Sequence, residues 1–238
     1  MRILLVGYGK MGQAIEKIAV ERGHEIVGKI GVNNATDLAL FNKQNTDVAI
    51  EFTRPEVGLS NITTCIKAGI PTVSGTTGWL DQWDSVLQLT QETQGAFFYA
   101  SNFSIGVNIF FQLNKQLAKM MNHFNDYTIE MEEIHHIHKL DAPSGTAITL
   151  AEGIFDHVDR KSNWSLEKEK TSTDVAIKAV REGEVPGTHI INYNSPIDTI
   201  EIKHEAHNRK GFASGAVLAA EFIATKKGVF GMEDMLKF

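Results

Sequence analysis

The amino-acid sequence predicts an α/β protein with two parts, a parallel-sheet domain followed by an α+β domain with a mixed, mostly antiparallel sheet. Two observations lead to this prediction. In the first 100 residues, short apolar runs alternate with helical patterns, as in parallel strands joined by crossover helices. Beyond about residue 126, several strand-like runs follow one another with only short turns between them, which indicates a sheet without crossover helices.

The first half contains five apolar runs and three helical patterns. The runs predict strands near residues 2–6, 25–30, 47–52, 71–75 and 96–100. The first helix is expected to end near residue 21, and the other two are expected to cover about 55–68 and 79–93. Gly23 is placed to stop the first helix. Pro55 suits the first turn of the second, because the N–H that proline lacks is unpaired there anyway.

Small and polar segments follow four of these predicted strands. Because parallel strands end at one edge, and ligands of such sheets bind beyond that edge, these segments should lie together near a ligand. They are Gly7–Gly12, Thr53–Pro55, Gly75–Gly78 and Ala100–Phe103.

The first of these segments, G-Y-G-K-M-G, has the pattern G-x-G-x-x-G between a strand and a helix. In that context the pattern predicts a Rossmann-like dinucleotide site. Gly7 permits the tight turn, Gly9 lets the backbone approach a pyrophosphate, and Gly12 lets helix and strand pack closely. The helix N-terminus then offers N–H donors to the phosphates. The alternative is a plain strand-to-helix turn.

The end of the second strand bears on the choice of cofactor. An acidic residue there usually binds the adenosine ribose of NAD, but no acid lies between Ile26 and Thr36. Lys29 and Lys10 are close in sequence to where a 2′-phosphate would lie. The sequence therefore predicts use of NADPH, alongside NADH. The alternative for Lys29 is a solvated lysine at a strand end.

In the second half, a strand is expected at about 126–136 and a helix at 143–155. Further strands are expected in the runs 175–183, 188–194 and 198–206, and the apolar segment 211–228 predicts a final helix that packs back onto the first domain. Residues 159–173 are strongly charged and are interpreted as an exposed excursion. The predicted domains are 1–104, a dinucleotide-binding domain completed by 209–238, and 105–208, a substrate-binding and oligomerisation domain.

Residues 133–147, E-I-H-H-I-H-K-L-D-A-P-S-G-T-A, hold three histidines and a lysine. Three interpretations are open: a metal site, a wet strand end, or a proton-donating pocket. In an extended strand His135 and Lys139 would share one face, and His136 and His138 the other. The three imidazoles therefore do not converge on one ion, and no metal is expected.

The turn after these residues favours the proton-donating pocket. Ser144, Gly145 and Thr146 open the predicted helix, and free N–H groups at a helix start suit a carboxylate. Histidine and lysine beside them can hold negative charge and deliver a proton. Such a pocket fits a small dicarboxylate that receives a hydride and then a proton.

Composition excludes several classes of function. The chain has 238 residues and a formal net charge of −6, which argues against general nucleic-acid binding. The apolar runs are all too short to span a bilayer, and the N-terminus lacks the pattern of a signal peptide. Cys65 is the single cysteine, which fits a reducing cytoplasm.

With these motifs in view, the chain resembles the dihydrodipicolinate reductases of bacterial lysine biosynthesis. The stretch E-x-H-H-x-H-K-x-D-A-P-S-G-T-A looks like the signature of that family. Five further motifs occur in the family's order, besides the N-terminal G-x-G-x-x-G: E-F-T-R-P at 51–55, G-T-T-G at 75–78, A-S-N-F-S-I-G-V-N at 100–108, V-P-G-T-H at 185–189, and R-x-x-F-A-x-G-A from Arg209 to Ala216.

The resemblance implies NAD(P)H-dependent reduction of 4-hydroxy-tetrahydrodipicolinate to tetrahydrodipicolinate, by a homotetramer paired through its C-terminal sheets. It implies His135 as the acid/base histidine, Lys139 as the proton donor, and His136, Gly145 and Thr146 as substrate carboxylate contacts, to which the turn adds Ser144. The implied cofactor contacts are Gly7, Tyr8, Gly9, Lys10, Met11, Gly12, Gly75, Thr76, Thr77, Ala100, Ser101, Asn102, Phe103, Arg209 and Phe212.

The sequence also departs from the family's pattern. Many relatives have an acid where Lys29 stands, residues 31–46 form a shorter segment, and Ile137 stands where arginine is frequent. Two rival functions differ in chemistry. A semialdehyde oxidoreductase would be expected to use a catalytic cysteine or another lysine pair, and an NADP-sensing regulator would need no proton donor. Whether His135 or Lys139 gives the proton is left open.

Overall fold

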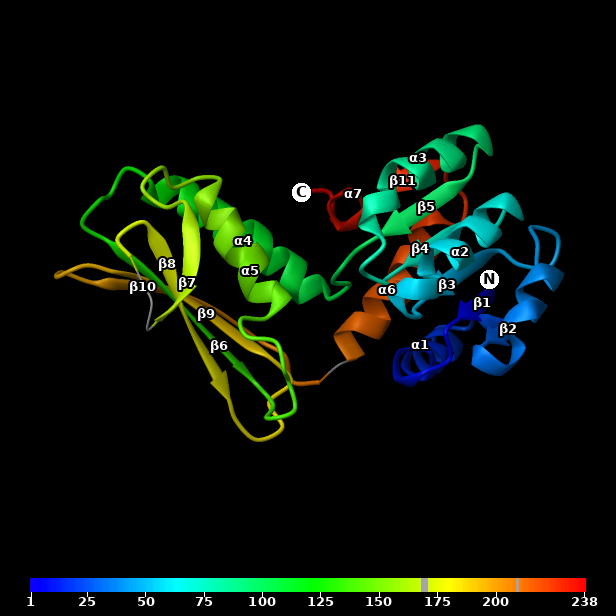
Figure 1. The fold of residues 1–238 in the computed structure, drawn as a ribbon, viewed down its shortest axis with the longest axis horizontal. Helices are drawn as coiled ribbons and strands as arrows, with labels where there is room; N and C mark the ends of the chain where they lie inside the picture. The colour runs from blue at the N-terminus through cyan, green and yellow to red at the C-terminus, as the bar shows by residue number, and fades with distance from the viewer. Residues whose placement is uncertain (168–170, 209) are drawn as a thin grey trace. The chain divides into compact units, whose positions relative to one another are not determined.

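The computed structural model describes residues 1–167, 171–208 and 210–238, which form two compact units (Figure 1). The first unit comprises Met1–Ile105 and Lys210–Phe238. The second comprises Gly106–Arg209, although Arg209 itself lies outside the described residues. Each unit contains its own sheet and its own hydrophobic core.

The first unit is built on a six-stranded sheet in the order β11-β5-β4-β3-β1-β2, with every neighbouring pair parallel. The strands are β1 (Arg2–Val6), β2 (Glu25–Ile30), β3 (Val48–Glu51), β4 (Thr72–Ser74), β5 (Ala96–Tyr99) and β11 (Gly228–Phe230). The helical elements are α1 (Lys10–Glu21), η1 (Val32–Leu40), α2 (Pro55–Lys67), η2 (Leu80–Gln82), α3 (Trp83–Glu92), α6 (Lys210–Ile223) and α7 (Met232–Leu236). The predicted Rossmann-like parallel sheet is confirmed.

Helices cover both faces of this sheet because side chains alternate along each strand. In β1, Ile3 and Leu5 belong to the core that includes α1 and α6, whereas Leu4 and Val6 belong to the core beneath α2 and η1. A strand buried on both faces has a continuous apolar sequence, which is the pattern of residues 3–6. Helix α6 packs onto this unit as predicted, and a Cβ at Gly215 would lie 1.7 Å from the carbonyl oxygen of Phe103.

The second unit has a five-stranded sheet in the order β10-β9-β6-β8-β7. Its strands are β6 (Thr128–His135), β7 (Asn163–Leu166), β8 (Asp174–Arg181), β9 (Thr188–Asn194) and β10 (Thr199–Glu205). Helices α4 (Ile105–Met121) and α5 (Gly145–Phe155) lie side by side in this unit (Figure 1), and side chains of both join the core of the sheet. The Asn114 side chain on α4 donates a hydrogen bond of 2.8 Å to the Leu150 carbonyl on α5.

The second sheet is mixed, as predicted, but its pairs are evenly divided. β10–β9 and β9–β6 are antiparallel, whereas β6–β8 and β8–β7 are parallel. The difference arises from the segment 159–173, which is not only an exposed excursion. It contributes β7 as an edge strand parallel to β8, while residues 168–170 lie outside the described residues.

Five elements were not expected from the sequence: η1, α4, β7, β11 and α7. In α4 the signal was present, because Val107, Phe110, Asn114, Ala118 and Met121 are buried at helical spacing. β11 has only three residues and joins the sheet beside β5. The short segment 31–46 holds the 3-10 helix η1 between β2 and β3. Among the described residues, no helix combines the length and apolar character needed to cross a bilayer.

Candidate active site

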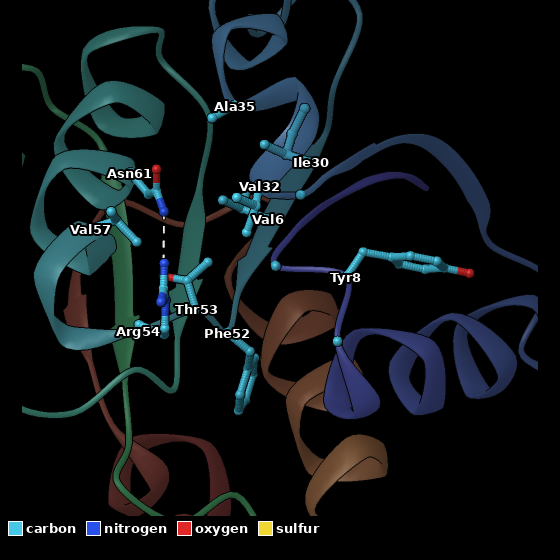
Figure 2. Close-up of a pocket in the computed structure, with 13 residues that line it drawn as sticks. Val6, Tyr8, Ile30, Val32, Ala35, Phe52, Thr53, Arg54, Val57 and Asn61 are labelled. Atoms are coloured by element: carbon cyan, nitrogen blue, oxygen red, sulfur yellow. Dashed lines mark hydrogen bonds between the residues drawn. The ribbon is translucent and has the colours of Figure 1, made fainter.

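A cavity of about 500 Å³ lies at the carboxyl edge of the first sheet, beyond the ends of β1, β2 and β3 (Figure 2). Its walls include Gly7, Tyr8 and Gly9, three of the predicted cofactor contacts, and the Thr53–Arg54 segment after β3. Other lining residues were not identified from the sequence, namely Ile30, Gly31, Val32, Ala35 and Asn61. Most of these follow the end of β2. Their position after a parallel strand could have predicted that they lie at the ligand-binding edge.

The glycines have the geometry that a dinucleotide needs. Gly7 has a φ of +99°, and a Cβ there would lie 1.9 Å from the Phe52 carbonyl oxygen. A Cβ at Gly12 would lie 2.2 Å from the Gly7 oxygen, whereas a Cβ at Gly9 would meet no described atom within 4 Å. No described side chain caps the start of α1, so its first N–H groups can bind an anion. These residues therefore fit a pyrophosphate.

Lys29 is paired with an acid that the sequence analysis did not consider. Its ammonium lies 2.6 Å from a Glu16 carboxylate oxygen on α1 and 4.8 Å from the centre of the Tyr8 ring. Tyr8 also donates a hydrogen bond to Glu16. The hydrogen bond from Lys29 holds the pKa of the Glu16 carboxyl below its usual value. A negative charge is thus present beside β2, although it comes from the first helix.

A buried carboxylate joins two of the segments that were predicted to lie at the ligand-binding edge of the sheet. Glu51, at the end of β3, is fully buried and accepts hydrogen bonds from the hydroxyls of Thr53, Ser74 and Thr76. The backbone N–H of Thr53 donates in turn to the Thr76 hydroxyl at 2.8 Å. Burial raises the pKa of the Glu51 carboxyl despite these donors. The side chain of Thr76 is therefore engaged inside the protein, whereas Thr77 is exposed.

The other predicted cofactor contacts differ in exposure. Lys10 and Ser101 are exposed, while Met11, Gly75, Asn102 and Phe212 are partly buried. Ala100 and Phe103 are buried, and the Phe103 ring packs against Phe52 and Phe98 in the core. Arg209 lies outside the described residues.

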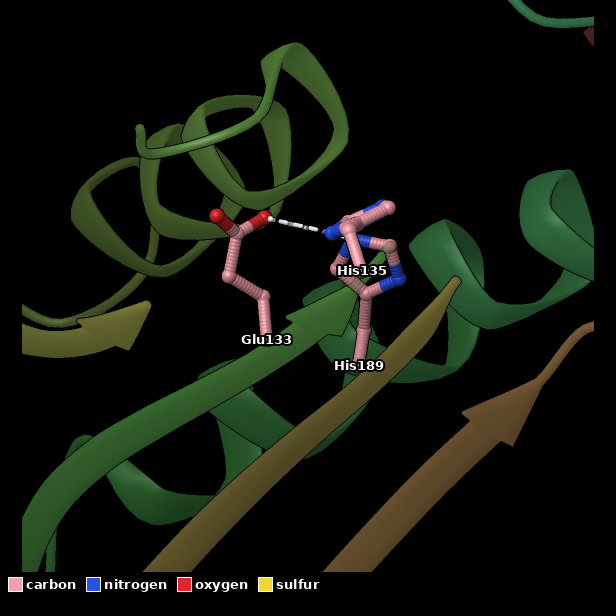
Figure 3. Close-up of side chains that lie close together, drawn as sticks. All are labelled: Glu133, His135 and His189. Carbon is pink, nitrogen blue, oxygen red and sulfur yellow. Dashed lines mark ion pairs between the residues drawn. The ribbon is translucent and has the colours of Figure 1, made fainter. Parts of the chain in front are cut away.

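A second group of candidate side chains lies at one end of the sheet in the second unit. Side chains alternate along β6, so Glu133 and His135 point to the same face, and both are buried. In the strand register Glu133 lies opposite His189 of β9, and His135 lies opposite Arg181 of β8. The sheet therefore brings together Glu133, His135 and His189, as Figure 3 shows, with Arg181 beside them.

Glu133 is the centre of this group. One of its oxygens lies 2.9 Å from the Arg181 guanidinium, and the other lies 3.4 Å from Nδ1 of His135. Both oxygens accept from the backbone N–H of Ser144 at 3.1 Å. Burial opposes ionisation of Glu133, but the hydrogen bonds from Ser144 and Arg181 outweigh it, so the carboxyl pKa is below its usual value.

Both buried imidazoles are neutral at neutral pH. Burial lowers the pKa of His135, and Lys139, Arg181 and His136 add to the effect, while the Glu133 carboxylate opposes it. Burial also lowers the pKa of His189 to about 3. The His135 and His189 rings meet edge to face with centroids 5.2 Å apart.

Strand β6 ends at His135, so the expected extended path to Lys139 is not observed. A turn at residues 137–138 follows, and Lys139 reaches the loop beyond it. The Lys139 ammonium binds both carboxylate oxygens of Asp141, at 2.9 and 2.8 Å. His138 is exposed and pairs with Glu184, so it lies apart from the buried group.

The predicted substrate contacts are arranged differently from one another. Ser144 caps α5: its hydroxyl accepts from the Ala147 N–H at 3.2 Å and lies 3.2 Å from Nε2 of His189. Its own N–H binds Glu133, so the carboxylate held by Ser144 in this structure belongs to the protein. Gly145 is exposed at the helix start, and Thr146 and His136 are partly buried.

The sequence analysis missed Glu133, Arg181 and His189. The available signal was the alternation of β6, which places Glu133 two residues before His135 on the same face. His189 belongs to the motif V-P-G-T-H, which by itself does not indicate a role for its histidine. Glu133, His135 and His189 offer ligand atoms within 4.8 Å of one another, close enough to hold a metal ion. Arg181 and Ser144 already engage both Glu133 oxygens, and the group is better explained as a hydrogen-bonding network.

Cys65 does not supply the nucleophile that a semialdehyde oxidoreductase would need. It is fully buried in α2, and burial raises the pKa of its thiol to about 12. A thiol in that state is not a reactive thiolate.

The buried His189 predicts an acid-sensitive second unit. Its pKa is 6.5 in an unfolded chain and about 3 in the fold, so between these values only the unfolded chain binds the proton. Stability should therefore fall as the pH falls from 6.5 toward 3. We expect His189→Asn to flatten this pH dependence in urea unfolding measurements. The control is His138→Asn, at an exposed histidine; equal slopes for wild type and His189→Asn would contradict the prediction.

A parallel sheet with a glycine turn, followed by a second unit with a mixed sheet of its own, is the architecture of one class of protein: a two-domain oxidoreductase that uses a nicotinamide dinucleotide. The chain belongs to the dihydrodipicolinate reductase family, whose N-terminal part matches residues 1–103 and whose C-terminal part matches residues 106–236. It is 50% identical over 236 residues to a 4-hydroxy-tetrahydrodipicolinate reductase of Christiangramia forsetii, covering 99% of this chain and 98% of that one.

Solved structures show the same fold. A dipicolinate-bound dihydrodipicolinate reductase from Paenisporosarcina sp. TG-14 has a TM-score of 0.77 at 22% identity, over 98% of this chain and 99% of that one. A probable dehydrogenase from Thermotoga maritima has a TM-score of 0.56 at 10% identity, over 99% of this chain and 92% of that one. At these identities the likeness concerns the fold alone.

Proposed function

We propose that the chain reduces 4-hydroxy-tetrahydrodipicolinate, also called dihydrodipicolinate, to tetrahydrodipicolinate with NAD(P)H in the diaminopimelate pathway to lysine. The observation that carries this proposal is the buried Glu133–His135 pair, followed directly by Lys139 and the start of α5. It occurs in a chain that is 50% identical along almost its whole length to a reductase of that name.

Separate groups of residues bind the cofactor, bind the substrate and donate the proton. The turn Gly7–Gly12 holds the pyrophosphate, and a bound reduced nicotinamide supplies the hydride. The exposed helix start at Gly145–Thr146, together with His136, holds the carboxylates of the substrate. Lys139, with His135 beside it, delivers the proton to the substrate atom that gains electron density. Ser144 supports this pocket as the cap of α5, because its N–H and hydroxyl are engaged within the protein.

The decisive experiment is an absorbance assay of NADPH oxidation. The substrate is made in the cuvette from pyruvate and aspartate semialdehyde by a synthase, and the chain is then added. We expect NADPH oxidation that depends on both precursors. If NADPH is consumed with aspartate semialdehyde alone, or is bound without turnover, the proposed reaction is wrong.

Cofactor preference should depend on the pair formed by Lys29 and Glu16. We propose that NADPH is used, alongside NADH, because Lys29 and Lys10 can pair with a 2′-phosphate. Glu16 neutralises Lys29 at 2.6 Å, which weakens that discrimination. We expect Glu16→Gln to raise the ratio of kcat/KM for NADPH over NADH, and Lys29→Ala to lower it, each by several-fold. Steady-state kinetics with both cofactors measures the ratio, and no change in either variant would refute the assignment.

The small dicarboxylate substrate, the cytoplasmic location and the homotetramer belong to the same proposal. Among the described residues, β10 has β9 as its single strand neighbour, so its other side can pair with another copy. Light scattering after gel filtration should give four times the mass of one chain, and a monomer would exclude the tetramer.

A further inference from the structure

The buried Glu133 is part of the candidate site, although the proposed function gives it no role. Its carboxylate is fully buried, although it carries none of the proposed chemistry. A buried charge is costly unless it is paired and hydrogen-bonded. Three groups contact it, His135, Arg181 and the Ser144 N–H, and Nε2 of His189 lies 3.9 Å from one of its oxygens. All four belong to the strands and loop that build the proposed proton-donating site.

Arg181 extends the influence of Glu133 to the loop that carries Lys139. Besides its ion pair with Glu133, its guanidinium donates to the carbonyl oxygens of Lys139 at 3.3 Å and Asp141 at 2.6 Å. These two carbonyls lie on either side of Leu140, which is 97% exposed. Arg181 therefore binds the main chain of the loop at residues 139–141. Glu133 binds the N–H of Ser144, where the loop ends.

Glu133 also lies where it can orient the His135 ring. Nδ1 of His135 is buried and makes no hydrogen bond to a described atom, yet it lies 3.4 Å from the Glu133 oxygen. A ring whose Nδ1–H faces a carboxylate keeps Nε2 as the proton-accepting nitrogen, and the carboxylate stabilises the imidazolium once it forms. On the other side of the ring, a Cβ at Gly187 would lie 3.1 Å from Nε2.

We propose that Glu133 is a positioning residue, which sets the orientation and proton affinity of His135 and, through Arg181, fixes the main chain at Lys139. This inference rests on the proposed reductase function for its kinetic consequence. Its structural part concerns the imidazole of His135 and is independent of turnover.

The charged groups around His135 determine the sign of the effect. Glu133 is the one anion among them that raises the proton affinity, whereas Lys139 and His136 of the loop and Arg181 of β8 lower it, and His189 of β9 packs against the ring. Asp141 is bound to Lys139. Removing the Glu133 charge should therefore move the titration of His135 to lower pH.

The test compares Glu133→Gln with Glu132→Gln. Glu132 is the residue directly before Glu133, so it lies on the opposite face of β6, and it pairs with Lys178 at 3.4 Å near the surface; it is therefore a matched control. We expect Glu133→Gln to lower kcat about 10- to 100-fold with an unchanged KM for NADPH, since general acid–base catalysis contributes about 100- to 10,000-fold. In the pH profile of kcat, the limb that reflects protonation of His135 should move to lower pH. Glu132→Gln should keep the kcat and the pH profile of the wild type.

A second measurement separates this inference from the proposed function. NMR titration of the imidazole signals, with His135 assigned through His135→Asn, should show the same shift to lower pH in Glu133→Gln without any substrate. If wild type shows no reductase activity but the shift is present, the function fails and the positioning role stands. If Glu133→Gln is unstable, Glu133→Asp is used, because it keeps the charge. In Glu133→Asp, His135 should titrate at a pH close to that of the wild type. An unchanged titration and an unchanged kcat in Glu133→Gln would overturn the proposal.

Discussion

Replacing Lys139 by methionine is expected to lower kcat by about 100- to 10,000-fold, the range of general acid catalysis, while NADPH affinity stays within about twofold of wild type. Methionine keeps the length of the side chain but cannot donate a proton. The cofactor turn Gly7–Gly12 belongs to the other compact unit, so its geometry should not change. His135→Ala should have a similar effect, because it removes the imidazole that accompanies the ammonium.

Turnover by stopped flow and NADPH binding by fluorescence check this prediction. Asp141→Asn is an informative companion, because Asp141 binds the Lys139 ammonium with both oxygens. It removes the partner and keeps the donor, so it should reduce kcat far less than Lys139→Met. If Lys139→Met weakens NADPH binding as much as it slows turnover, the ammonium serves the cofactor and the assignment of the proton donor is wrong.

Replacing Gly9 and Gly12 by alanine should separate cofactor binding from folding. At Gly9 a Cβ meets no described atom within 4 Å and φ is −85°, so Gly9→Ala should fold with an unchanged Tm. The added methyl group would stand in the space of the pyrophosphate. We expect the Kd for NADPH to rise about tenfold or more, which corresponds to about 1.4 kcal/mol.

Gly12→Ala should behave differently, because its Cβ would lie 2.2 Å from the Gly7 oxygen. Overpacking of this kind costs about 1–3 kcal/mol, so both Tm and NADPH affinity should fall. Calorimetry and isothermal titration measure the two quantities. Unchanged NADPH binding in Gly9→Ala would show that the pyrophosphate lies elsewhere.

Much of the fold was predictable because local patterns and tertiary burial agree in the first unit. Residues 3–6 are apolar without alternation, since both faces of β1 are covered, and the structure has a parallel strand there. Apart from α4, a 17-residue helix whose helical spacing was present in the sequence, the elements that were missed are short or lie at edges. β11 and β7 have three and four residues, so too little periodicity is present, and their pairing with β5 and β8 is a non-local choice.

The candidate site was likewise predictable only in part. His135, Lys139 and the Ser144–Thr146 turn are close in sequence, so their common location was predictable from the motif. Arg181 and His189 come from β8 and β9, more than 40 residues away, and only the strand register places them beside Glu133. Lys29 is a further case: its partner Glu16 lies on α1, 13 residues before it, and not after β2 where the acid of a dinucleotide site is expected.

The sequence by itself determined the family, the parallel sheet with its glycine turn, and the histidine–lysine stretch, because each depends on residues that are neighbours in the chain. Only the tertiary structure decided which charges meet. It buried Glu133 against His135 and Arg181, turned the N–H of Ser144 toward that carboxylate, and ended β6 before Lys139. The physical reason is that hydrogen bonds and ion pairs depend on distances of about 3 Å across strands, which the spacing of residues along one chain does not specify.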